Sequence, residues 1–292
     1  MNDNEFNAAI KLLDDPDVAE IVEQQIVSQG TKIIGRLREV SQKNYVQKNS
    51  DVVIKMDKII DQIYFSHIID RLKGWVGNSS NLLEGAWLVS QVNYPKIDFK
   101  YIESQMSTVY DAVVGEYCKN YSPLERIRVM NYVFYKKLKF HSNNSEMYSP
   151  CSSLINKVFE YKQGNTVTMA ILYGLMLQKV GLPVYCVNMP KNFLLAYTAE
   201  ECGHPEEVIF YINPYNKGMV LSRKEIDFFL KLQKIKPSDE YIKPCNNITT
   251  IQRLVCGLKF AYSCNEDIGN FKRMEEVEKV FPQQLAQGIE WN

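Results

Sequence analysis

Cysteine and histidine side chains are the first candidates for chemistry in this sequence. Cys151 is predicted to open a short helix that runs to Tyr161, and the positive end of a helix dipole lowers the pKa of a thiol. His141 lies shortly before it in a polar loop and could act as its base. A nucleophilic cysteine also needs a third group to orient the histidine and donors for an oxyanion, and the sequence marks neither. We therefore favour an unreactive Cys151 and keep the Cys151–His141 pair as the alternative.

The spacing of these residues argues against a metal centre. The seven cysteines are odd in number and irregularly spaced, and no Cys-x-x-Cys pair occurs. The three histidines, His67, His141 and His204, are scattered along the chain. We expect no metal site, no disulfide framework and no cofactor. His67 recurs with apolar residues along a predicted helix, which favours a core or boundary position for it.

The charges balance, with 34 basic and 34 acidic residues among 292. No overall field therefore draws the protein to nucleic acid or to an anionic membrane. One predicted helix carries a group of cations, but its period places Ile127, Val133 and Leu138 on the buried side and the cations in solvent. We expect no nucleic-acid partner. The cations are Arg126, Arg128, Lys136, Lys137 and Lys139.

The N-terminal residues are acidic, whereas a secretory signal needs a basic start and an apolar core. No uncharged apolar segment reaches the length that spans a bilayer. These features predict a cytoplasmic protein without a membrane partner.

The stretch from Gln163 to Tyr197 is the one that the rest of the chain must be organised around. Residues 166–177 are almost all apolar and uncharged, which requires burial on nearly every side of a helix. Gly181-Leu182-Pro183 is a typical helix end. Residues 184–188, 193–197 and 208–212 are then apolar runs of strand length. The pattern predicts a central buried helix with a small antiparallel sheet packed on it.

Helices are predicted on both sides of this core. In the N-terminal region Asp15 is the expected N-cap of a helix that begins at Pro16, and a further amphipathic helix covers 51–73. Three helices are expected to start near Ser80, Asp98 and Ser122. Residues 222–225 have the spacing of a capping box, and residues 247–281 look like one helical hairpin.

The central stretch resembles the core of the transglutaminase-like superfamily. In that family a Gly-x-Cys opens the buried helix, a small residue follows on its next turn, and a Gly-x-Pro closes it. Gly164-Asn165-Thr166, Ala170 and Gly181-Leu182-Pro183 fall at those positions. The resemblance extends over about residues 80 to 281 and is nearest to the bacterial SirB-type branch, which has a tetratricopeptide-like tail. It implies a papain-like fold.

The resemblance also locates the three positions of the family's catalytic triad. Thr166 stands at the cysteine position, Asn192 at the histidine position and Asn213 at the acid position. A threonine hydroxyl is far harder to ionise than a thiol, and an asparagine cannot take up and return a proton near neutral pH. The family pattern therefore implies no catalytic residues here. It also implies that the three replaced side chains converge on one cleft.

These features together predict a mostly helical α+β fold with a transglutaminase-like (papain-like) core flanked by helical hairpins. The expected regions are a HEAT-like N-terminal part at 1–75, the core at 80–236 and a tetratricopeptide-like hairpin at 245–292. The expected function is that of a catalytically inactive module that binds or scaffolds an unknown protein or peptide. The alternative is a cysteine-type hydrolase or amide-bond transferase with a rearranged site and Cys151 as its nucleophile.

Overall fold

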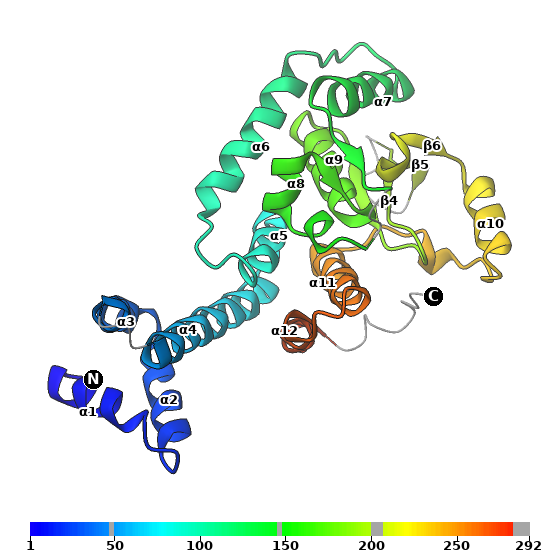
Figure 1. Cartoon of the computed structure of the whole chain (residues 1–292). Helices are drawn as coiled ribbons and strands as arrows, with labels where there is room; N and C mark the ends of the chain where they lie inside the picture. The colour runs from blue at the N-terminus through cyan, green and yellow to red at the C-terminus, as the bar shows by residue number, and fades with distance from the viewer. Residues whose placement is uncertain (47–49, 145–147, 200–206, 283–292) are drawn as a thin grey trace. The chain divides into compact units, whose positions relative to one another are not determined.

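The computed structural model describes residues 1–46, 50–144, 148–199 and 207–282. Contacts between residues divide the chain into two compact units, Met1–Gly74 and Trp75–Asn292. Helices predominate, and one four-stranded sheet and one two-stranded sheet accompany them (Figure 1). The expected mostly helical α+β class is confirmed. No helix within the described ranges is both long enough and apolar enough to cross a membrane.

The first unit is entirely helical in its described residues. Its core is a cluster of buried apolar side chains that includes Phe6, Ile26, Leu37 and Met56. The elements are α1 (Asp3–Leu12), α2 (Ala19–Ser28), the 3₁₀ turn η1 (Gly30–Ile33), α3 (Ile34–Val46) and most of α4 (Ser50–Gly77).

The start of α2 differs from the prediction. The carboxylate of Asp15 accepts a hydrogen bond from the Asp17 amide at 3.1 Å, and the helix begins only at Ala19. Asp15 and Pro16 therefore form a turn before the helix. A local side-chain bond to the next-but-one amide competes with capping, which explains why the sequence signal misplaced the helix start.

Helices of the second unit begin close to the predicted positions. Asn81, Asp98 and Ser122 are N-caps whose side chains accept amide hydrogen bonds from the first turn. The helices before the sheet are α5 (Leu82–Gln91), α6 (Phe99–Val114), α7 (Pro123–Asn131) with its π-helical continuation η2 (Tyr132–Lys137), the 3₁₀ turn η3 (Pro150–Ser152), α8 (Ile155–Tyr161) and α9 (Thr166–Lys179). Those after it are α10 (Arg223–Leu232), the 3₁₀ turn η5 (Asp239–Tyr241), α11 (Asn247–Cys264) and α12 (Ile268–Glu278).

Helix α9 is the centre of the second unit, as predicted (Figure 1). Ala170 and its neighbours on every side of the helix are fully buried. The helix contacts α6, α11 and strands β3 (Val184–Val187) and β4 (Leu194–Thr198). Gly181 follows its end with φ +78°, a left-handed conformation that glycine adopts without a steric penalty.

The antiparallel sheet has the order β3-β4-β5-β6, where β5 is Val208–Asn213 and β6 is Met219–Leu221. The three predicted strands are present, and the short β6 is an addition. A methyl group on Gly174 of α9 would lie 3.3 Å from Leu195, so the missing side chain lets β4 pack closely on the helix. The opposite face packs on α10. Its core includes Leu194, Ala196, Tyr211, Ile226 and Leu230.

The loop before η3 is tied to the start of α9 by a parallel strand pair that the sequence did not predict. Strand β1 (His141–Ser142) pairs with β2 (Gln163–Gly164). The His141 amide donates to the Lys162 carbonyl at 2.8 Å, and the Asn143 amide donates to the Gly164 carbonyl at 3.2 Å. This pairing brings residues 141–143 beside the N-terminus of the central helix.

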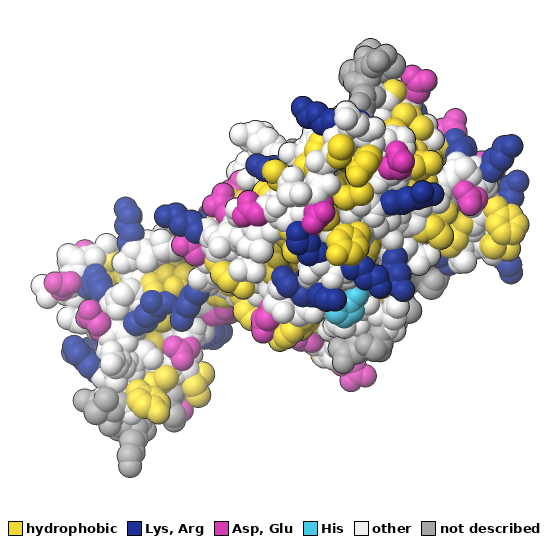
Figure 2. Space-filling view, turned by 90° about the horizontal axis from the view of Figure 1, so that it is seen from above, with side chains coloured by type: hydrophobic (Ala, Val, Ile, Leu, Met, Phe, Trp, Pro, Cys, Tyr) yellow, Lys and Arg dark blue, Asp and Glu magenta, His cyan; other side chains and the backbone are white. Residues whose placement is uncertain are grey.

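The surface carries both signs of charge. Figure 2 shows Lys and Arg side chains interspersed with Asp and Glu on the visible face. On the cationic helix Ile127 and Val133 are buried and Arg128, Lys136 and Lys137 are exposed, as the period of its apolar residues predicted.

Candidate functional site

A cavity of about 500 Å³ opens at the N-terminus of α9. Separate parts of the second unit meet there, namely the loop before α8, the start of α9, the β3–β4 turn, the turn after β5, and helices α10 and α11. The described lining residues are Asn144, Tyr148, Ser149, Ser153, Asn165, Thr166, Lys191, Asn192, Tyr215, Phe229, Gly257, Phe260 and Ala261.

The start of α9 is held by a network of short hydrogen bonds. The Asn165 carbonyl oxygen Oδ1 accepts from the amides of Val167 at 3.0 Å and Thr168 at 2.9 Å. Its Nδ2 donates to the Ser153 hydroxyl at 2.7 Å, while the Thr168 hydroxyl donates to the Ser152 carbonyl at 2.7 Å. The side chain of Asn165 therefore caps the N-terminus of α9. Thr166, the first helical residue, lines the cavity beside it.

Two of the three predicted triad positions share this cavity. Thr166 and Asn192 are both half-buried and both line it. The Oδ1 of Asn192 accepts a hydrogen bond from the Phe193 amide at 2.9 Å, which fixes the orientation of its side chain. Lys191, immediately before it, has φ +59° and also lines the cavity.

Asn213 has a different place. It is buried, it is not among the described lining residues, and its Oδ1 accepts from the Asn216 amide at 3.1 Å. That bond caps the 3₁₀ turn η4 (Pro214–Asn216), from which Tyr215 reaches the cavity. The Tyr215 hydroxyl donates to the Asn143 carbonyl at 2.8 Å. Asn213 therefore supports the turn that supplies a lining residue.

Residues that belong to no recognisable sequence motif anchor this turn. The Tyr135 hydroxyl donates to the Pro214 carbonyl at 2.6 Å, and Asn131 Nδ2 donates to the Gly218 carbonyl at 3.1 Å. Asn131 Oδ1 in turn accepts from the Tyr173 hydroxyl at 2.6 Å. Burial raises the pKa of Tyr173 well above its ordinary value, so this hydroxyl stays protonated and remains a donor.

The Cys151–His141 pair is not assembled. Cys151 lies in η3, and α8 begins only at Ile155, so the expectation that Cys151 opens this helix is wrong. His141 is exposed, with its Nδ1 3.1 Å from the Lys139 carbonyl oxygen. Neither residue is among the described lining of the cavity, and no hydrogen bond joins them in the part of the chain that the structure describes.

Thiol alkylation tests the cysteine alternative. Burial raises the thiol pKa of Cys186 and Cys245, and burial with the nearby Glu278 carboxylate raises that of Cys256 to about 12, whereas Cys264 is exposed. Because the thiolate is the reactive form and burial limits access, we expect iodoacetamide at pH 7.5 to modify Cys264 faster than each of these three buried thiols. Peptide mapping by mass spectrometry measures the order. A Cys151 that reacts faster than Cys264 would favour the hydrolase alternative.

The described cavity lining combines aromatic side chains with hydrogen-bonding groups. Tyr148 and Phe260 are in edge-to-face contact, with ring centroids 5.4 Å apart. Lys191 is the one charged side chain in the described lining, which contains no thiol, imidazole or carboxylate. Such a lining suits an apolar group attached to a hydrogen-bond acceptor or an anion. It offers no described pair that could act as nucleophile and base.

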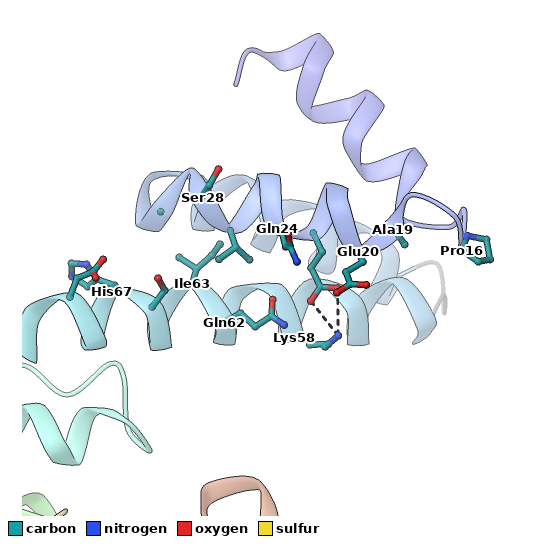
Figure 3. Close-up of a pocket in the computed structure, with 14 residues that line it drawn as sticks. Pro16, Ala19, Glu20, Gln24, Ser28, Lys58, Gln62, Ile63 and His67 are labelled. Carbon is teal, nitrogen blue, oxygen red and sulfur yellow. Dashed lines mark hydrogen bonds and ion pairs between the residues drawn. The ribbon is translucent and has the colours of Figure 1, made fainter. Parts of the chain in front are cut away.

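A second hollow, of about 890 Å³, lies in the first unit between α2 and α4 (Figure 3). It is largely polar, and Lys58 forms an ion pair with Glu23 at 3.2 Å across it. His67 lines this hollow and is exposed, so its expected core or boundary position is wrong. Among the described residues, no group of three or more His, Cys, Asp and Glu side chains could hold a metal ion.

A central buried helix that starts beside a cleft and packs on an antiparallel sheet is the architecture of the transglutaminase-like class. The model of the transglutaminase-like superfamily matches residues 100–256, more than half of the chain. The protein belongs to this superfamily.

Several curated proteins are similar at low identity. A "UPF0162 protein" of Xylella fastidiosa is 27% identical over 154 residues, which cover 50% of this chain and 50% of that protein. "F-box only protein 21" of Homo sapiens is 24% identical over 204 residues, covering 59% of this chain and 32% of that protein. A "UPF0162 protein" of Vibrio cholerae is 21% identical over 189 residues, covering 63% and 67%. The chain thus spans about half the length of the Xylella relative, and it matches 32% of the human one. No solved structure matches significantly.

Proposed function

We propose that this protein is a catalytically inactive transglutaminase-like module that binds a peptide segment in the cavity at the start of α9. The observation that carries the proposal is the described lining, which contains Thr166 and Asn192, the two residues that we align with the nucleophile and the base of the family pattern. No described neighbour in the cavity could serve as the nucleophile or the base instead, because the described lining lacks a thiol, an imidazole and a carboxylate.

The ordered surroundings of the cavity support a binding role. Asn165, Ser153 and Thr168 make well-formed hydrogen bonds around the helix start, and Asn213 holds the turn that carries Tyr215. A cavity lined by aromatic side chains and hydrogen-bonding groups accommodates an apolar peptide side chain and its backbone carbonyl groups. Lys191 adds a preference for an acidic residue nearby.

Three finer assignments belong to this proposal. The branch is the bacterial SirB-type group, the first unit is HEAT-like and the α11–α12 hairpin is tetratricopeptide-like. The protein acts in the cytoplasm, without a nucleic-acid or membrane partner. A protein or peptide partner agrees with the similarity to a protein named for its F-box, although this chain matches only 32% of that relative.

The test is a selection of phage-displayed peptides on the wild-type protein, with removal of phage that also bind Thr166→Phe. Thr166 lines the cavity, so a phenylalanine ring at this first position of α9 takes up space that a ligand would need. We expect the surviving peptides to be enriched in an apolar residue with a neighbouring acid. Their affinity, measured by fluorescence anisotropy, should fall by about a hundredfold on Thr166→Phe, which corresponds to about 2.7 kcal/mol.

Thr166→Val is the matched control, because it keeps the shape of threonine and removes only the hydroxyl. It should bind the selected peptides within about tenfold of the wild type, the effect of one hydrogen bond. Both variants should melt cooperatively near the wild-type temperature. Failure to recover any peptide that distinguishes the wild type from a folded Thr166→Phe would contradict a ligand site in this cavity.

A further inference from the structure

Strand β5 is longer than the strand that covers its outer edge. Residues Tyr211, Ile212 and Asn213 pair with β6, whereas β5 begins at Val208. On its other side β5 is paired with β4 from Val208 onward. In the part of the chain that the structure describes, no strand pairs with residues 208–210 on the β6 side. That edge presents backbone groups that require hydrogen-bond partners.

The structure shows why β6 stops. The register of β5 and β6 would place Arg223 opposite Ile209, but Arg223 is the first residue of α10. A capping box between Ser222 and Glu225 turns the chain into this helix. Arg223 is then held by the carboxylates of Asp227 at 2.9 Å and Asp239 at 2.8 Å. Among the described residues this edge is therefore unpaired, because the chain turns into α10 after β6.

A hollow of about 580 Å³ lies beside the open edge. Ile209 is 55% exposed at its rim, and the largely buried Tyr211 and Ile242 also line it. The described lining residues are Val208, Ile209, Tyr211, Arg223, Asp239, Ile242, Lys243 and Pro244. Successive side chains of a strand point to opposite faces, so a strand added at this edge would direct alternate side chains toward the hollow.

The charges of the hollow favour one kind of side chain. Arg223 is already compensated by two carboxylates, one of which, Asp239, is also a lining residue. Lys243 is exposed and has no ion-pair partner among the described residues. Lys243 is therefore the cation of the described lining that can still pair with an acidic residue of a ligand.

We propose that the open edge of β5 binds an extended peptide segment of another protein by strand addition. The peptide pairs with residues 208–210, places an apolar side chain against Ile209 and Ile242, and places an acidic side chain near Lys243. Backbone hydrogen bonds supply affinity in this mode, and the hollow supplies specificity. A second copy of this chain fits less well, because pairing of such a short edge with itself buries far less than the roughly 1,200 Å² of a stable interface.

The surface is separate from the cavity at the start of α9. None of the residues that line the hollow is among the described lining of that cavity. A partner could therefore occupy the two sites independently, and failure of one proposal leaves the other intact.

The experiment is a phage selection on the full chain in which binders to Ile209→Lys are removed. Lysine at an exposed edge position opposes strand pairing without disturbing the core. Ile268→Lys on α12 is the matched control, since Ile268 is 67% exposed and lies outside the hollow. Selected peptides should bind wild type and Ile268→Lys equally and Ile209→Lys about tenfold or more weakly. Lys243→Glu should reverse the preference for an acidic residue.

Peptide N-methylation separates strand addition from other binding. Two versions of a peptide are compared, one methylated on the odd-numbered amides and the other on the even-numbered amides. One version should lose binding and the other should bind almost as before, because only one of the two sets of amides faces β5. Three results would overturn the proposal: no peptide that discriminates Ile209→Lys from Ile268→Lys, equal effects of the two methylation patterns, or a wild-type dimer in analytical ultracentrifugation that Ile209→Lys dissociates.

Discussion

Replacement of Ala170 by lysine is expected to abolish soluble folding of the protein. Ala170 is fully buried in the middle of α9, and the residues around it, such as Met169 and Ile171, are also fully buried and apolar. An unpaired ammonium group at such a position costs several kcal/mol, even after its pKa falls. This is comparable to the whole stability of a typical domain, about 5 to 15 kcal/mol.

Soluble yield and circular dichroism of Ala170→Lys measure this effect. The matched control is Ala8→Lys, the same substitution at an exposed position of α1, which should change the free energy of unfolding by less than about 0.5 kcal/mol. A soluble, cooperatively folded Ala170→Lys would show that α9 is not the buried centre of the second unit.

Gly218→Ala is expected to be the most damaging glycine-to-alanine change near the cavity. Gly218 has φ +67°, and an added methyl carbon would lie 1.8 Å from Oδ1 of Asn131. Asn131 would have to move, and its bonds to the Gly218 carbonyl and the Tyr173 hydroxyl would break. Left-handed strain costs about 1 to 2 kcal/mol, and buried groups without partners add about 1 to 3 kcal/mol each. We expect a loss of more than about 3 kcal/mol in urea denaturation.

Gly181→Ala measures the cost of the left-handed backbone conformation without a steric collision of the added methyl group. Gly181 has φ +78°, but nothing lies within 4 Å of a methyl carbon built there. It should lose only the strain energy of about 1 to 2 kcal/mol. Equal losses for the two variants would mean that the contact between Gly218 and Asn131 does not hold the turn that carries Tyr215.

The central helix and three strands could be predicted because their signals are local. A long uncharged apolar run followed by Gly181-Leu182-Pro183 has few structural solutions, and the strand-length runs after it pair with their nearest neighbours in the sequence. That Thr166 and Asn192 lie beside one cavity was implied by the resemblance to the family and not by local order, and both residues line the cavity.

Features that depend on distant contacts could not be predicted. Strands β1 and β2 are short and are defined by bonds between segments far apart in the sequence, and the anchoring bond of Tyr135 to the Pro214 carbonyl spans a longer gap. Asn213 shows a second limit, which is local. Its position in the family pattern did not reveal that its side chain caps the η4 turn, because that depends on the local path of the backbone after β5.

The most direct test of the central claim is the fate of a bound peptide. A peptide selected for the cavity at the start of α9 is incubated with the wild-type protein at 37 °C together with a primary amine, and both molecules are weighed by intact-mass spectrometry. The proposed function predicts that the peptide is recovered without cleavage or amine incorporation and that the protein carries no acyl adduct. A shortened or amine-modified peptide, or an adduct on the protein, would contradict binding without catalysis.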